Sequence, residues 1–301
     1  MFDYKLLEAL ATVVSESGFD KAAKVLHLTQ SAISQRIRLL EEQTGQILLV
    51  RTSPPTPTSA GQQLLKHALQ VRQLEEDLRQ ELGSGDKSGW INLALGINAD
   101  SLATWFPQII LPFLQDSRIL LDIRVDDQEQ THRLLKDGEV IGCVSTQEQA
   151  MQGCSVTYLG CMHYRAWATP SFAQIWLPQG FDREASERAP IILFNRKDEV
   201  HHRLLEQLWG LVPTALPAHY APSSEQFSRW ITAGIGYGML PDQQSASAQK
   251  QGLLIDLAPG HSVPVKLYWH CWNIQSPSLL RLTAHLAREA RRLLDDSPAT
   301  L

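Results

Sequence analysis

The chain has few of the residues and segments that mark several classes of protein. Its 301 residues include four cysteines, and none of them forms a CxxC pair or stands near histidines at zinc-ligand spacing. The sequence therefore offers neither a structural zinc site nor a redox dithiol, and we expect reduced thiols, no metal and no cofactor. No stretch approaches the roughly 20 apolar residues that a membrane-spanning helix needs, so we expect no membrane partner.

The motifs that usually accompany catalysis are also missing. The sequence contains no nucleophile elbow, no HExxH and no Walker loop, so we expect a protein that is not an enzyme. The opening MFDYKLLEAL carries Asp3 and has no basic segment before an apolar stretch, which argues against a signal peptide. With 44% hydrophobic and 20% charged residues, the composition is that of a soluble globular chain, which we expect in the cytoplasm.

Charge is distributed unevenly along the chain. The formal net charge is −5, from 27 Lys and Arg against 32 Asp and Glu. Residues 21–72 nevertheless hold seven basic and two acidic residues, a net charge of +5, which leaves −10 for the remainder. A basic segment joined to an acidic body favours a reader of nucleic acid attached to a domain with a different task.

The first 45 residues have the pattern of three short helices. Apolar residues recur at helical spacing over residues 6–14, and we expect Gly18 to close this helix in the left-handed conformation. Asp20 is placed to cap a second helix, DKAAKVL, and Thr29 to cap a third, QSAISQRIRLLEEQT. A short helix and a tight turn before a third helix with one polar face indicate a helix-turn-helix.

The third helix has a face that suits the major groove of DNA. Its apolar residues, among them Ile33 and Ile37, share one stripe, and the opposite side is polar. The major groove admits one α-helix, whose outward amide and hydroxyl groups can match base edges. Arginines bind phosphate, which adds affinity but little sequence information. We expect base contacts from Gln30, Ser31, Ser34 and Gln35, and phosphate contacts from Arg36 and Arg38.

The stretch FDKAAKVLHLTQSAISQRIRLLEEQTGQILLVRT, followed by PTSAG, resembles the winged helix-turn-helix of LysR-type transcriptional regulators. Residue types agree at the caps, the recognition face, the glycine after the helix and the arginine of the wing. The resemblance implies double-stranded DNA as the partner, the base contacts given above, and backbone contact by Arg51 as well as by the two helix arginines. Many relatives carry basic residues at the wing tip, where this chain has Pro54, Pro55 and Pro57, so minor-groove contact by the tip is not expected.

Residues 59–82 predict one long helix with an apolar stripe over about six turns. The stripe consists of Leu64, Leu65, Ala68, Val71, Leu74, Leu78 and Leu82. Such a stripe needs a partner, and the resemblance implies that this is the dimerisation helix; packing on the body of the same chain is the alternative. A dimer would present two recognition helices to a DNA site with two half-sites. Residues 83–89, GSGDKSG, have the composition of a flexible hinge.

Beyond residue 89, short apolar strands alternate with helices, which indicates an α/β sheet with parallel crossovers. The resemblance extends here to the effector domain of the same regulators, two α/β subdomains related to periplasmic binding proteins. We expect crossovers between the subdomains near His163 and Val263. The fold class is multidomain α+β, with a winged helix-turn-helix over 1–58, the long helix over 59–82, the hinge over 83–89, subdomain I over 90–163 and 264–301, and subdomain II over 164–263.

Several motifs of this half are similar to the branch of the family that regulates export of arginine and lysine. They are NADSLATW, GEV leading into VSTQ, SSE and LYWH. The resemblance implies a basic amino acid, arginine or lysine, as the effector bound between the subdomains, and a gene for a basic amino-acid exporter as the target. It also implies a homodimer or a dimer of dimers, with RNA polymerase as a further partner.

Ligands of open α/β sheets bind beyond the carboxyl ends of strands, near helix N-termini. The expected strands of subdomain I run into three polar segments there, and a fourth opens a helix of subdomain II. Hydroxyl groups suit the carboxylate of a basic amino acid, and acids suit its cationic ends. Single members suit helix caps equally well, so the set as a whole carries the prediction. The expected ligand residues are Asn98, Asp100, Ser101, Asp127, Ser145, Thr146, Ser223, Ser224 and Glu225.

Two further motifs carry little weight. Gly234, Gly236 and Gly238 end a helix and enter a strand, the reverse of a dinucleotide fingerprint. His201 and His202 are adjacent on a helix and cannot easily share one metal, so we expect surface histidines. A ligand-independent architectural or replication-regulating DNA-binding protein remains the alternative function. An enzyme or solute carrier is disfavoured by the missing catalytic motif and signal peptide.

Overall fold

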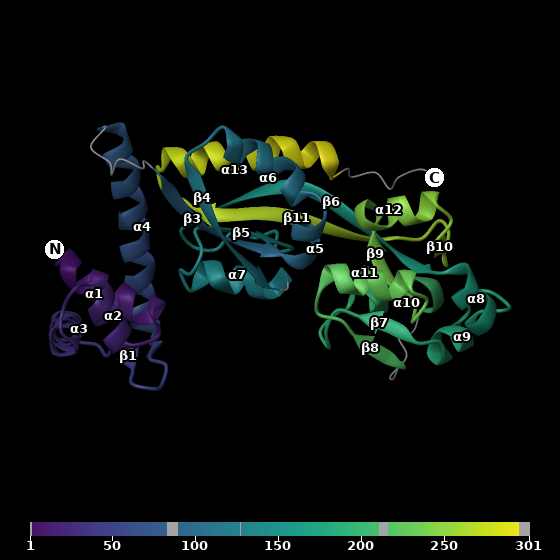
Figure 1. The fold of residues 1–301 in the computed structure, drawn as a ribbon, viewed down its shortest axis with the longest axis horizontal. Coiled ribbons are helices and arrows are strands. Elements are labelled where there is room, and N and C mark those ends of the chain that lie inside the picture. The colour runs from purple at the N-terminus through teal and green to yellow at the C-terminus, as the bar shows by residue number, and fades with distance from the viewer. Residues whose placement is uncertain (1, 83–89, 127, 211–215, 295–301) are drawn as a thin grey trace.

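The computed structural model describes residues 2–82, 90–126, 128–210 and 216–294. A three-helix head lies at one end of an elongated molecule, the long helix α4 (Ser59–Glu81) stands beside it, and the rest forms a two-part body (Figure 1). The expected hinge over 83–89 lies outside the described residues. Among the residues that are described, no helix is both long and apolar enough to cross a membrane.

Three helices build the head: α1 (Tyr4–Ser15), α2 (Phe19–Val25) and α3 (Gln30–Thr44). Their apolar sides meet in one core, in which Leu10, Ile33 and Leu40 are fully buried. Thr29 caps α3 as expected, because its hydroxyl accepts the amide of Ala32 at 3.2 Å. The predicted helix-turn-helix is therefore present, with a stripe of buried residues on α3 facing the other two helices.

Two expected helix ends are wrong. Gly18 is extended, with φ 169°, and Ser17 instead takes the left-handed conformation, with φ 55°. The amides of Gly18 and Ser17 bond to the carbonyls of Val13 and Val14, so the left-handed position falls one residue before the glycine. Asp20 does not cap α2, because Gly18 is the N-cap and Asp20 lies within the first turn.

A short wing follows α3. Strands β1 (Leu49–Val50) and β2 (Thr56–Pro57) pair antiparallel. Glu41 of α3 accepts the amide of Leu48 at 2.9 Å, which fixes the wing to the third helix. Gly61, in the first turn of α4, passes so close to the Leu48 carbonyl that a side chain there would collide with it. The three helices, the wing and the start of α4 are thus one packed unit.

Helix α4 packs on two cores in succession. Leu65 belongs to the core of the head, whereas Leu69, one turn later, packs against the core of the body. Lys66 lies against Gly138, where an added Cβ would stand 3.1 Å from the Lys66 Cα atom. Part of the long helix therefore packs on its own chain, the alternative that the sequence left open.

Polar side chains join α4 to the body farther along. Gln73 and Asp77 are buried, and Ser278 lies between them. The Ser278 hydroxyl donates to Asp77 Oδ1 at 2.7 Å and accepts from Gln73 Nε2 at 3.1 Å. The opposite side of the helix stays open, with exposed fractions of 40%, 52% and 69% for Leu74, Leu78 and Leu82. One side of α4 thus packs against the body of its own chain, and another side is exposed to solvent.

Three parallel strands form the centre of subdomain I: β3 (Ile91–Asn98), flanked by β4 (Ile119–Asp126) and β5 (Gly142–Ser145). Helices α6 (Phe106–Gln115) and α13 (Pro277–Leu293) cover one face of the sheet, and α7 (Gln128–Lys136) covers the other (Figure 1). The stretch LATWFPQIILPFLQ, expected as one helix, forms α5 (Ala99–Ala103) and α6. Pro107 lacks an amide hydrogen and therefore starts a helix rather than continuing one.

Two long antiparallel strands, β6 (Cys154–Ala168) and β11 (Val263–Trp272), extend this sheet. They pair from Cys154 opposite Trp272 to Tyr164 opposite Val263, beside the expected crossovers. The sheet is therefore mixed, and the expectation of parallel crossovers holds for only part of it. Sequence analysis missed β6, because residues 159–168 are all buried and lack the alternation of a half-exposed strand. The subdomain bounds stay a prediction.

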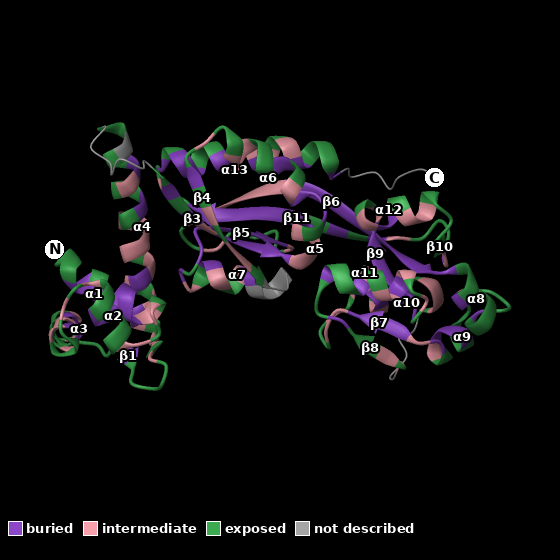
Figure 2. Cartoon of the chain, viewed as in Figure 1, coloured by how far each residue is buried: buried purple, intermediate pink, exposed green. Residues whose placement is uncertain are grey.

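Subdomain II is arranged around the far ends of these strands. Strands β9 (Gly238–Pro241) and β10 (Ile255–Asp256) pair with the second half of β6, and β7 (Ile191–Leu193) pairs in parallel with β8 (Ala218–Tyr220). Its helices are α8 (Pro170–Trp176), α9 (Arg183–Arg188), α10 (Val200–Trp209), α11 (Ser224–Thr232) and α12 (Asp242–Lys250). Figure 2 shows buried residues along β6 and β11, the strands that join the two halves of the body.

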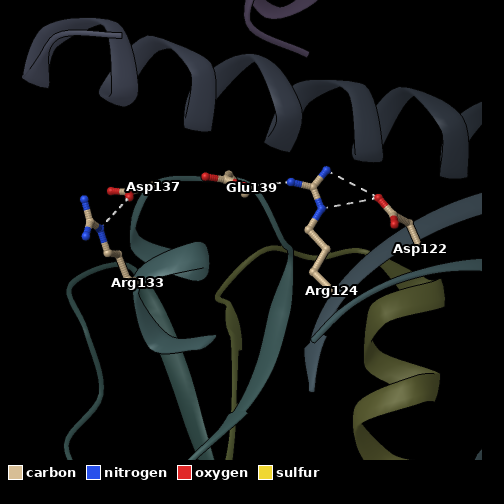
Figure 3. Close-up of polar contacts among 5 residues, drawn as sticks. All are labelled: Asp122, Arg124, Arg133, Asp137 and Glu139. Carbon is tan, nitrogen blue, oxygen red and sulfur yellow. Dashed lines mark hydrogen bonds and ion pairs between the residues drawn. The ribbon is translucent and has the colours of Figure 1, made fainter. Parts of the chain in front are cut away.

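The open edge of the sheet, at β4, carries charged side chains. Arg124 bonds to Glu139 at 2.7 Å and to Asp122 at 3.3 Å, and Arg133 pairs with Asp137 at 3.4 Å (Figure 3). Charges on an edge strand hinder pairing with a strand of another molecule. Helix α4 passes over this cluster in Figure 3, and the turn at Gly138 already contacts Lys66 of that helix. The charged edge therefore adjoins the junction of α4 with the body.

A buried ion cluster holds α12 and β10 against β6. The Arg165 guanidinium is buried and bonds to Asp242 at 3.0 Å and to Asp256 at 3.6 Å. Burial raises the pKa of Asp256 even though the guanidinium opposes this shift, so desolvation dominates at that carboxyl. The Arg165 guanidinium therefore balances the charge of both Asp242 and Asp256.

We predict that Arg165→Ala lowers the free energy of unfolding by about 1.5–3 kcal/mol, because two half-buried carboxylates lose their charged hydrogen-bond partner. Urea unfolding followed by circular dichroism measures this. Arg183→Ala is the control, because Arg183 pairs with Glu187 at 3.0 Å on the surface and its loss should cost less than about 1 kcal/mol. Equal losses in the two variants would contradict a special role for the buried cluster.

Candidate recognition face and interdomain cleft

The polar side of α3 is accessible at the outer end of the head (Figure 1). Gln30, Ser31 and Gln35 are exposed, and Ser34 is half-buried. The Ser31 hydroxyl shares a hydrogen bond of 2.9 Å with Thr29, the residue that caps the helix. The four side chains expected to contact bases therefore lie on the first two turns of one helix, on the side away from the core.

The three arginines of the expected DNA surface differ in their surroundings. Arg51 is exposed beside the wing. Arg38 is exposed and forms an ion pair with Glu42 at 3.3 Å, a surface pair that contributes little free energy and separates easily. Arg36 is half-buried, and its guanidinium lies 3.5 Å from the carbonyl oxygen of Lys5 on α1. Arg51 and Arg38 are thus free to reach phosphate, whereas Arg36 is partly held by the head itself.

A cavity of about 160 Å³ lies where the two subdomains meet. Subdomain I contributes residues that follow β3 and β5, among them Asp100 and Thr146. Subdomain II contributes the loop after β7, residues 194–199, and the start of α10. Tyr164 of β6 and Val265 of β11 complete the wall. The cavity is therefore bounded by both halves and by the strands that join them.

Asp100 spans the boundary between the subdomains. Its Oδ2 atom accepts the Tyr164 hydroxyl at 2.7 Å, and its Oδ1 atom accepts the hydroxyl of Ser224, on α11, at 2.8 Å. These two donors fix the carboxylate at the cavity wall. They also occupy the Ser224 hydroxyl, which the sequence had offered to a ligand carboxylate.

A second acid, Asp198, faces the same cavity, and sequence reasoning missed it. Its oxygens accept the amides of Phe194 and Val200, both at 3.1 Å. Burial raises the pKa of Asp198, and the nearby Asp100 charge acts in the same direction. Asp198 follows strand β7, so the strand-end rule applied to subdomain I would have found it in subdomain II as well.

Further polar groups complete the cavity. Asn98 is almost fully buried, lines the cavity, and has no hydrogen-bond partner for its side-chain oxygen. Lys197 and Arg203 add positive charge, and Gln244 adds an amide. The cavity therefore offers acceptors in the form of two carboxylates and an amide oxygen, and it offers cationic donors for a carboxylate.

The other sequence-predicted ligand residues divide into three groups. Ser101 and Ser145 are fully buried and do not line the cavity, because the first accepts the Trp105 indole N–H at 3.0 Å and the second the Gln147 amide at 3.2 Å. Ser223, Ser224 and Glu225 line an adjoining, more open depression. Asp127 lies outside the described residues.

Two members of that depression have local partners. Ser223 caps α11 through the amide of Gln226, at 3.5 Å, and Glu225 pairs with Arg229 at 3.7 Å on the surface. The structure thus brings Asn98, Asp100 and Thr146 to the cavity. It places the serines and the glutamate of α11 at its outer margin.

The histidine pair on α10 is not where we expected it. His201 is buried rather than at the surface, and burial lowers its pKa to about 3. Its ring lies 3.9 Å from that of His202 between centroids, with the two planes tilted by 46°. Among the described residues, no three His, Cys, Asp or Glu side chains are placed to hold a metal ion. Cys143, Cys154, Cys161 and Cys271 form no disulfide within the described residues.

Two family descriptions match the chain. Residues 4–62 match "Bacterial regulatory helix-turn-helix protein, lysR family", and residues 87–291 match "LysR substrate binding domain". A relative from Pseudomonas fluorescens strain Pf-5, "HTH-type transcriptional regulator ArgP", is 44% identical over 289 residues, 96% of each chain. The ArgP of Aeromonas salmonicida is 39% identical and covers 97% of this chain and 98% of its own.

Solved structures agree with the same assignment. The crystal structure of ArgP from Mycobacterium tuberculosis superposes with a TM-score of 0.90 at 37% identity, covering 99% of this chain and 100% of the other. Full-length LysG from Corynebacterium glutamicum with bound effector Arg has a TM-score of 0.79 at 31% identity, with 97% and 99% covered. The chain therefore belongs to the LysR family of helix-turn-helix transcriptional regulators, and over nearly its whole length it is similar to ArgP regulators.

Proposed function

We propose that the protein is a transcriptional regulator whose activity on DNA responds to a basic amino acid, arginine or lysine, bound in the cavity between its subdomains. The observation that carries the proposal is the pair of carboxylates, Asp100 and Asp198, that face one cavity from opposite subdomains. The relative LysG, solved with bound Arg, supports the same class of ligand.

The chemistry of the cavity matches the three charges of such an amino acid. Two carboxylates and the unpartnered Asn98 oxygen suit the α-ammonium group and the cationic end of the side chain. Lys197 and Arg203 suit the α-carboxylate. A neutral amino acid has one cation to offer, so one of the two carboxylates would receive no cation from the ligand.

The head is proposed to read double-stranded DNA. The exposed side of α3 would contact bases through Gln30, Ser31, Ser34 and Gln35, and Arg36, Arg38 and Arg51 would bind the backbone. The target we propose is a gene for a basic amino-acid exporter, with RNA polymerase as a partner at that promoter. This follows the resemblance to regulators of arginine and lysine export.

A second copy of the chain is proposed to cover the open side of α4. Leu74, Leu78 and Leu82 lie on that side and are exposed in the part of the chain that the structure describes. Pairing of two such helices would give a homodimer, or a dimer of dimers, with two recognition helices for two half-sites. The side used by Gln73 and Asp77 stays occupied by the body.

Calorimetric titration of the full chain with arginine and with lysine tests the effector. We expect saturable heat with at least one of them and none with a neutral amino acid such as leucine. No heat at millimolar arginine or lysine would favour a ligand-independent DNA-binding protein instead.

We predict that Asp100→Asn weakens binding of the basic amino acid by about 10- to 100-fold, because a charged hydrogen bond contributes about 1.5–3 kcal/mol. Glu225→Gln is the matched control, since Glu225 is exposed and paired with Arg229 at 3.7 Å, and it should change Kd by less than about 3-fold. A larger effect of Glu225→Gln would move the site to the outer depression.

We predict that Arg51→Ala weakens binding to all duplexes and lowers the slope of log K against log salt by about one unit. Fluorescence anisotropy at several salt concentrations measures both. Arg183→Ala, on an exposed helix of subdomain II, should leave slope and affinity unchanged. An unchanged slope in Arg51→Ala would remove the phosphate contact.

We predict that Gln30→Ala narrows the gap between cognate and scrambled DNA by about 1–3 kcal/mol, because it removes a base contact. Competition binding with the two duplexes measures the gap. An equal loss on both duplexes would assign Gln30 to the backbone.

A further inference from the structure

The two acids of the cleft are not equivalent. Asp100 accepts two hydroxyl groups, from Tyr164 and Ser224, at 2.7 and 2.8 Å. Asp198 accepts only backbone amides, those of Phe194 and Val200, both at 3.1 Å. Hydroxyl donors can rotate to follow a change in charge, whereas backbone amides are fixed. Asp198 is therefore held in one orientation toward the cavity whether or not it is ionised.

Both carboxylates line one small cavity, which Lys197 and Arg203 line as well. Asp100 comes from α5 and Asp198 from the loop before α10, so one belongs to each subdomain. Two like charges at one cavity repel, and the less solvated one gives up its charge first. Burial is the largest influence and raises the pKa of Asp198; the amides of Phe194 and Val200 oppose this rise, and the Asp100 charge adds to it.

Other titratable groups face this carboxyl from the neighbouring elements. Lys197 and Glu199 lie on its own loop, Arg203 on α10, and Tyr164 on β6, and all four line the same cavity. His202, on α10, favours the ionised carboxylate of Asp198 through its charge. Histidine is the side-chain type that most often exchanges protons near neutral pH, so an experiment must separate His202 from Asp198.

We propose that Asp198 is an effector-binding residue that exchanges a proton for the cationic end of the effector. Below the raised pKa of this carboxyl group, Asp198 is protonated in the empty cleft. When the cationic end of the effector reaches Asp198, the Asp198 O–H bond breaks, the proton passes to the solvent, and the carboxylate pairs with the ligand. The inference rests on the proposed function, since it assigns a role within that same cleft.

The exchange makes the cleft respond to pH as well as to ligand. A bound cation favours the ionised carboxylate, so the ligand binds more tightly as pH rises through the raised pKa of Asp198. Above that pKa the affinity becomes constant. At pH values where the proton is present, each binding event releases up to about one proton. A basic amino acid carries its charges throughout this range, so it contributes no proton itself.

Counting protons in the full-length protein tests the proposal. Arginine is titrated calorimetrically between about pH 4.5 and 7.5 in pairs of buffers with different ionisation enthalpies, and the dependence of the heat on the buffer gives the protons released. We expect release that falls toward zero as pH rises, with a matching rise in affinity. Binding without any release in that range would overturn the proposal and leave the effector assignment intact, whereas absence of binding would overturn the effector assignment.

Three variants identify the group. Asp198→Asn should bind arginine at least about 10-fold more weakly and release no proton. Asp182→Asn is the matched control, because Asp182 also accepts a backbone amide at a helix start, at 2.8 Å, but is exposed away from the cavity, and it should behave like the parent protein. His202→Gln should keep the release. Release that persists in Asp198→Asn and disappears in His202→Gln would assign the proton to the histidine and refute the proposal.

Discussion

The antiparallel pairing of β6 with β11 is the constraint on which the rest of the body depends. One end of this ladder completes the sheet of subdomain I, and the other carries the strands of subdomain II. The cavity lies beside the end of this ladder where Tyr164 pairs with Val263, and Tyr164 and Val265 form part of its wall. The ladder thus joins the two halves of the body from which Asp100 and Asp198 reach the cavity. Arg165, one residue beyond Tyr164, ties α12 and β10 to the same strand.

The segment that contains the recognition helix and the body of the chain differ in net charge. Residues 21–72 hold few acidic side chains and carry a net charge of +5, whereas the rest of the chain carries −10. Long-range electrostatics therefore attracts this segment to DNA phosphates and repels the acidic body from them. Within the acidic body, two of the carboxylates are withdrawn from water at the cavity, where their interaction with a cation is stronger than at the surface. The overall charge of the chain averages these two environments and describes neither.

Sequence reasoning found the parts that depend on local patterns. The cap at Thr29, the buried stripe of α3 and the acid after β3 follow from helix periodicity and from the rule that ligands bind at strand ends. It failed where tertiary contacts decide. Ser101 follows the same strand but turns inward to an indole, and β6 is buried on both sides and shows no alternation. Asp198 stands in the loop after β7, so the rule that ligands bind at strand ends also covers it.

The packing of α4 on two cores has a mechanical consequence. Leu65 is held by the core of the head and Leu69 by the core of the body, so one helical turn separates the two clamps. A single turn of helix resists twisting, and within the described residues no loop interrupts it. The head and subdomain I are therefore coupled through this short stretch of α4. A change in the orientation of the head relative to subdomain I therefore requires α4 to bend or to lose its contacts with one of the two cores.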